Sequence, residues 1–133
     1  MKQEDINTIL SDVVNTSGFV NLDQTDIDNL KASVDTLDAI KLAGKDDAIG
    51  NLLSVAISTL KDSNKDKSIK KLLFAIRLAK ESNFIVEYIS KIRDVLETTS
   101  GDFDFVWGIS TNENLECGSI ELIVVVGLVS QRH

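Results

Sequence analysis

The segment SIELIVVVGLV, residues 119–129, restricts the fold more than any other part of this chain. Its odd and even positions are both largely apolar, so an extended strand there is apolar on both faces. Strands of this kind are typically buried inside a sheet. The run is too short to cross a bilayer as a helix, which takes roughly 20 apolar residues. The chain is therefore predicted to contain a sheet with helices packed against it.

Three further segments are predicted to be strands, and they span residues 37–43, 69–78 and 102–110. The middle one, IKKLLFAIRL, is ambiguous between helix and strand by periodicity alone. The alternation of Leu72, Phe74 and Ile76 between polar turns favours a strand. The segment DFDFVWGIS and the final strand are joined by the polar loop TNENLECG, which predicts a hairpin between them.

Helices are predicted where apolar residues recur at helical spacing, over residues 4–14, 27–34, 49–60 and 84–96. Asp23 is a candidate N-terminal cap for the second of these helices, Asp46 or Asp47 for the third, and Asn83 for the fourth. The segment KDSNKDKS, residues 61–68, is predicted to be a solvated loop. The resulting fold class is α/β (or α+β), with a mixed sheet of about four strands against helices in one domain.

The charge and the rare residues exclude several functions. The net charge of −7 argues against nucleic acid and anionic membranes as partners, since both favour basic surfaces. One cysteine, Cys117, and one histidine, His133, exclude an internal disulfide, cysteine-rich zinc sites and histidine-based catalysis. No metal site is predicted. The acidic, polar start is unlike a signal peptide, so a cytoplasmic protein is expected.

Two groups of residues carry the remaining candidate chemistry. Phe103, Phe105 and Trp107 form an aromatic row that suits base stacking, but core packing is favoured because basic residues are missing nearby in the sequence. The segment GFVNLDQTD, residues 18–26, places Asn21, Asp23 and other polar groups after a glycine. It lacks the glycine and glutamate of an EF-hand calcium loop. On the residues alone, helix capping by Asp23 with Asp26 in the first turn is favoured.

The motif N-L-D-x-x-D after Gly18 resembles the catalytic "synergy" loop of FtsZ, a tubulin relative. The downstream stretch DFDFVWGISTNENLECGSIELIVVVGL is similar to the last two strands of that family and their turn. Residues 42–49, LAGKDDAI, resemble a further family segment through Ala43, Gly44 and Ala48. Residues 56–58 also fit the family's next helix. The resemblance spans roughly residues 4–129 in matching order.

The resemblance covers only the C-terminal half of the family. It implies a central-helix remnant at residues 1–17, a synergy-like loop at 18–26, and a sheet-and-helix domain at 27–129. The G-G-G-T-G-T-G signature of the nucleotide-binding half is absent from this sequence. The chain is therefore expected to be a stand-alone domain with no enzyme activity or cofactor of its own.

In the family, the loop of one subunit completes the GTPase site of the next. The resemblance implies that Asp23 and Asp26 polarise the attacking water on GTP held by a partner, and that Gly18, Asn21 and Leu22 contact that partner. Positioned carboxylates suit phosphoryl transfer, which depends on orientation and electrostatics. Lys41 and Glu121 depart from the family pattern, because small or apolar residues are usual there.

Three functions follow as expectations. In the first, the domain docks on the end of a filament of an FtsZ-type or tubulin-type GTPase, caps it and modulates its turnover. In the second, the chain is a piece of a longer GTPase. As a third alternative, it is a self-associating structural domain with no nucleotide role, and the acidic segment is only a helix cap.

Overall fold

The computed structural model describes residues 6, 8–9, 24–32, 34–79, 86–98, 104–112, 115–116 and 118–130. Its elements along the chain are α2 (Gln24–Lys31), β1 (Thr36–Lys45), η1 (Asp46–Ala48), α3 (Ile49–Ser63), β2 (Lys67–Ala79), α4 (Val86–Thr98), β3 (Asp104–Asn112) and β4 (Ser119–Ser130). Residues 6, 8 and 9 are also helical. The predicted mixed four-stranded sheet with helices against it is confirmed.

The strand order in the sheet is β1-β4-β2-β3. β4 pairs antiparallel with both β1 and β2, while β3 pairs parallel with β2. The predicted hairpin between β3 and β4 is therefore wrong, because β2 lies between them. The central place of β4 agrees with its apolar residues on both faces, since it has a neighbour on each side and cover above and below.

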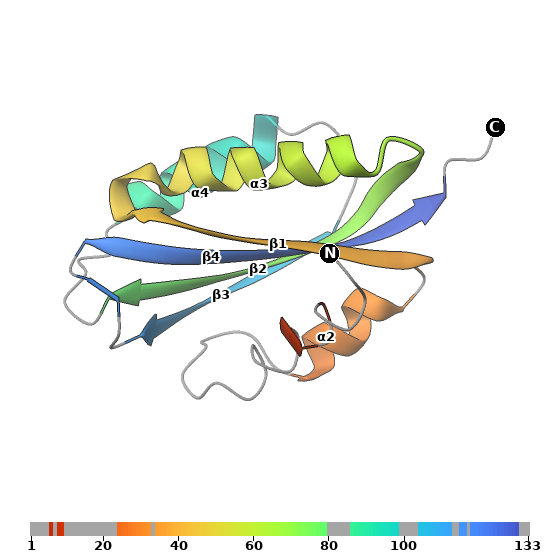
Figure 1. Ribbon diagram of the computed structural model, residues 1–133, viewed down its shortest axis with the longest axis horizontal. Helices are drawn as coiled ribbons and strands as arrows, with labels where there is room; N and C mark the ends of the chain where they lie inside the picture. The colour runs from red at the N-terminus through yellow and green to blue at the C-terminus, as the bar shows by residue number, and fades with distance from the viewer. Residues whose placement is uncertain are drawn as a thin grey trace.

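Helices α3 and α4 cover one face of the sheet, and α2 lies on the other (Figure 1). The larger core lies under α3 and α4, where the even-numbered residues of β2 and β4 point. Ile49, Leu53 and Leu60 of α3 are buried there against Phe74 and Val124. Their spacing along α3 is that of one helical face, which is why this segment forms an amphipathic helix.

The smaller core lies under α2. Ile27 and Leu30 of α2, with Ile6 from the helical residues before it, pack on Leu73 and Val125 of the sheet. Gly127 of β4 allows this close approach. A Cβ atom at Gly127 would lie 2.8 Å from Val34 Cγ1 and 3.1 Å from the Leu30 carbonyl oxygen. A glycine is needed here because the end of α2 contacts the strand itself.

Two boundary predictions are corrected. The N-cap of α3 is Ala48, which makes no side-chain capping bond, because the chain enters α3 through the short η1 instead of a capped loop. The predicted loop at 61–68 shrinks to a turn at 64–66, between α3 and β2. Asn64 closes that turn by donating to Leu60 O and to Asp38 Oδ2 of β1, both at 2.8 Å.

Candidate functional site

Asp26 is the one predicted site residue that the structure describes. It lies in the first turn of α2 and is partly exposed. An acidic residue in this turn is favourable, because the helix dipole is positive at its N-terminus. Gly18, Asn21, Leu22 and Asp23 lie outside the described residues, so the roles predicted for them stay predictions.

The position of α2, and with it Asp26, is fixed by the apolar face of the helix and by contacts at its C-terminal end. Ile27 and Leu30 bury the inner face in the smaller core. From β2, Lys71 Nζ donates to the carbonyl oxygens of Asn29 and, at 2.9 Å, of Ala32. Asn29 lies in the last turn of α2 and Ala32 directly follows the helix, and a cation at this end offsets the negative end of the helix dipole. Lys71 thereby ties the end of α2 to the sheet.

Asp26 borders a groove of about 270 Å³ between α2 and the strands β2 and β3 at the edge of the sheet. The groove is lined by Asp26, Asn29, Leu30, Lys71, Leu72, Phe105 and Val106. A carboxylate at such an open edge can accept a hydrogen bond from a water or from a donor on a partner. Among the described residues no group of three or more histidine, cysteine, aspartate or glutamate side chains is placed to hold a metal ion.

The aromatic residues of β3 divide into two environments. Trp107 stacks on the buried Phe74, with ring centroids 5.7 Å apart and an interplanar angle of 10°, and packs against the larger core. Core packing is therefore confirmed for Trp107. For Phe105 that prediction is wrong, because 51% of its surface is exposed. Phe103 lies outside the described residues.

A second groove, of about 460 Å³, lies on the α4 side of the same edge. It is lined by Ile92, Arg93, Leu96, Glu97, Phe105 and Trp107. Phe105 borders both grooves, so it stands between them at the sheet edge. Arg93 of α4 places a basic group beside Phe105 and Trp107. The sequence did not reveal this proximity, because Arg93 lies more than ten residues before them in the chain.

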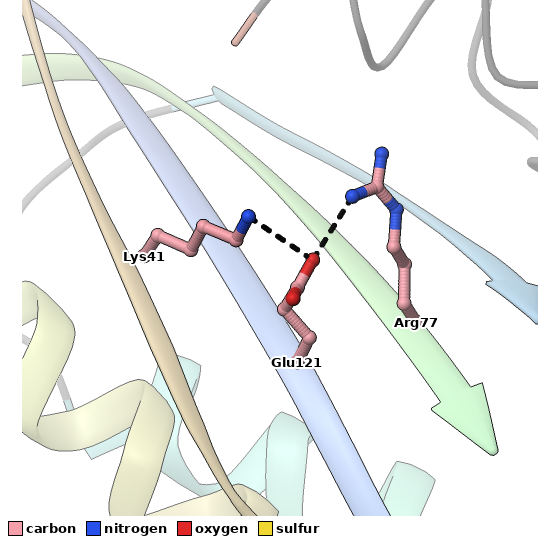
Figure 2. A network of polar contacts seen from close by, with 3 residues as sticks. All are labelled: Lys41, Arg77 and Glu121. Carbon is pink, nitrogen blue, oxygen red and sulfur yellow. Dashed lines mark hydrogen bonds and ion pairs between the residues drawn. The ribbon is translucent and has the colours of Figure 1, made fainter. Parts of the chain in front are cut away.

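A charged network crosses the face of the sheet that carries α2 (Figure 2). Glu121 Oε1 on β4 accepts a hydrogen bond from Arg77 Nη1 on β2 at 2.9 Å and lies 3.5 Å from Lys41 Nζ on β1. Lys41 and Glu121, the two departures from the family pattern, thus contact each other. Sequence reasoning missed Arg77, although a lone arginine in an apolar strand signals a buried ionic partner.

Solved structures share this fold. The empty FtsZ dimer of M. jannaschii matches with a TM-score of 0.57 and 16% identity, over 100% of this chain and 45% of that one. A point mutant of the same FtsZ gives a TM-score of 0.56 and 14% identity, over 97% and 43%. Thiamine monophosphate kinase from Aquifex aeolicus gives 0.51 and 15%, over 99% and 45%.

At these identities the likeness concerns the fold and leaves the activity open. The chain spans less than half the length of these structures. No protein-family model and no curated protein matches the chain. In the described part of the chain, no helix has the length and apolar character that crossing a membrane requires. The chain therefore has an FtsZ-like fold, and a kinase shares this fold over 99% of the chain.

Proposed function

We propose that this chain is an FtsZ-like protein-interaction domain that docks on the end of an FtsZ-type or tubulin-type GTPase filament. The observation that carries the proposal is the match of the whole chain to about half of FtsZ, together with the motif N-L-D-x-x-D that leads into α2. A domain that brings one contact face to the filament end would cap the filament or change its turnover. Such a partner would be met in the cytoplasm, in cell division.

The proposed contact uses Asp23 and Asp26 as the groups that act in trans on the partner's GTP, with Gly18, Asn21 and Leu22 as contact residues. Asp26 is partly exposed at the start of an anchored helix, which suits a carboxylate that must meet a ligand outside its own chain. Oriented water near the γ-phosphate is what such a site requires. GTP would be held by the partner alone, so the domain itself is no enzyme.

The test is GTP turnover and filament sedimentation of an FtsZ protein from the same source, measured with and without the domain. We expect a dose-dependent change in either quantity, lost with Asp23→Ala/Asp26→Ala. The matched control is Asp62→Ala/Asp66→Ala, which removes two exposed carboxylates from the far end of α3 and its turn. The control should behave like the unmodified domain. An unchanged turnover and pellet at domain concentrations far above that of filament ends would refute docking on that partner.

A second candidate is a self-associating structural domain with no nucleotide role. The half-exposed Phe105 on the edge strand β3 favours it, because an exposed sheet edge with apolar side chains can pair with another chain. The match to a kinase as well as to FtsZ is compatible with it, since the fold alone does not specify filament binding.

A further inference from the structure

Strand β3 forms one edge of the sheet, and no strand of the described residues pairs with its outer side. Its sequence, DFVWGISTN, contains neither lysine nor proline, the residues that commonly protect an edge from pairing. Phe105 is half exposed there, with a groove above it and a groove below it. An added strand at this edge would place its alternate side chains over these two grooves.

Helix α4 runs beside this edge in the direction opposite to β3. It connects β2 to β3, and these two strands are parallel, so the crossover helix has to return antiparallel to them. α4 and β3 share the larger groove, which contains Arg93 and Glu97 of the helix. Both side chains are exposed, and neither forms an ion pair with a described residue.

We propose that a second copy of this chain occupies the edge, paired antiparallel through β3 about a twofold axis near Val106. Under that operation residue 105 of one copy lies opposite residue 107 of the other. Phe105 then forms a cross-strand aromatic pair with Trp107 of the second copy, and the reciprocal pair forms too. Trp107 of the second copy thereby covers the half-exposed Phe105 of the first, and the reverse holds as well.

The charges on α4 select a second copy over another partner. The twofold axis also brings the two α4 helices together antiparallel, which sets Arg93 of each copy against Glu97 of the other. The surface is therefore complementary to itself in charge and in aromatic residues. Two chains of net charge −7 repel each other at long range, so an interface between them needs matched opposite charges of this kind.

This inference deepens the second candidate function and does not require the first. The charge variants described below leave Asp23 and Asp26 unchanged. Failure of self-association would therefore leave the GTP turnover assay interpretable, and failure of docking would leave the dimer intact. Because Asp26 and Phe105 border the same groove, variants of Phe105 are kept out of the turnover assay.

The first test is sedimentation equilibrium of the full chain from about 1 µM to about 500 µM, with the fluorescence of Trp107 recorded in parallel. Trp107 is the single tryptophan, so its emission reports on the interface directly. We expect a monomer–dimer equilibrium, with reduced acrylamide quenching of Trp107 as the dimer forms. Phe105→Lys should raise the dissociation constant at least about tenfold. Val55→Lys is the matched control, because Val55 is 53% exposed on α3, away from this edge.

The second test uses charge reversal. Arg93→Glu alone sets acidic groups against acidic groups across the axis, and Glu97→Arg alone sets basic against basic, so each variant should be more monomeric than the unmodified chain. An equimolar mixture of the two variants restores both opposite-charge contacts and should form a heterodimer. The double variant Arg93→Glu/Glu97→Arg should dimerise by itself. Circular dichroism checks that every variant is folded.

A chain that stays monomeric through about 500 µM would overturn the proposal, and so would a dimer that Phe105→Lys and the single reversals leave unchanged. A mixture that remains monomeric, while the unmodified chain dimerises, would exclude the contact between positions 93 and 97.

Discussion

Arg77 and Glu121 form an ion pair across neighbouring strands, with 2.9 Å between Nη1 and Oε1. Arg77 is only 7% exposed, so its charge has little contact with water. Removing one partner from a pair of this kind leaves an uncompensated buried charge, which typically costs about 3–5 kcal/mol. Removal of either partner alone is therefore expected to destabilise the fold. Replacement of both partners by apolar residues is expected to cost little stability.

Glu121→Ala should lower the free energy of unfolding by about 3 kcal/mol, because the buried charge of Arg77 then loses the carboxylate at 2.9 Å. Urea denaturation measures this change. The double variant Arg77→Met/Glu121→Leu is the control, and we expect its stability within about 1 kcal/mol of the unmodified chain. A double variant that loses as much stability as the single variant would show that the cost does not come from the buried charge of Arg77.

Lys41→Ala tests the other cation of the network and should cost less than about 1 kcal/mol. Its side chain is 49% exposed and its Nζ lies 3.5 Å from Glu121 Oε1, so water and salt screen the attraction. The same urea titration at low and at high salt should show a small difference that disappears at high salt. A loss as large as that of Glu121→Ala would mean that Lys41, not Arg77, neutralises the carboxylate.

Gly127→Ala should destabilise the protein by about 1–3 kcal/mol, since the new methyl group overlaps Val34 and crowds the Leu30 carbonyl. Thermal unfolding reports the change as a lower midpoint. Gly44→Ala is the matched control within the same sheet. Its new Cβ would meet only the end of the Leu52 side chain, at 3.2 Å, which can turn aside. Equal losses in the two variants would argue against close packing of α2 as the cause.

The sequence was sufficient to locate all four strands, and insufficient to order them. β2 was recognised because Leu72, Phe74 and Ile76 alternate, and the structure puts them all in one core. The loop between β3 and β4 suggested that these two strands form a hairpin, but β3 pairs with β2 instead. β2, α4 and β3 form a parallel crossover unit, which places β3 beside β2 and leaves β4 free to enter between β1 and β2.

The candidate site was predictable only in part, for a related reason. The first-turn position of Asp26 follows from local helix chemistry, so local sequence could indicate it. The exposure of Phe105 depends on which strand lies at the edge, and that is a non-local property. Arg77 and Glu121 are 44 residues apart. In the sequence each is an isolated charged residue in an apolar strand. Only the register of β2 and β4 shows that they lie opposite one another.

Asp26→Ala should lower the stability by less than about 1 kcal/mol, the usual worth of an acidic residue near a helix N-terminus. Urea denaturation checks this, with Asp26→Asn as the isosteric comparison. The result bears on the proposed docking, because a small loss means that any change in the partner's GTP turnover arises at the contact and not from unfolding. A loss of several kcal/mol would instead assign Asp26 a mainly structural role.

Lys71→Met should loosen α2 while leaving the sheet intact. Methionine keeps the apolar stem of the side chain but cannot donate to the carbonyls of Asn29 and Ala32, so a loss of about 1–2 kcal/mol is expected. Hydrogen exchange localises the effect: amides of α2 should exchange faster, whereas those of β2 and β4 keep their protection. Lys70→Met is the control, because Lys70 is the exposed neighbour of Lys71 on the same strand. Uniformly faster exchange across the sheet would show that Lys71 supports the whole fold and not the anchoring of α2.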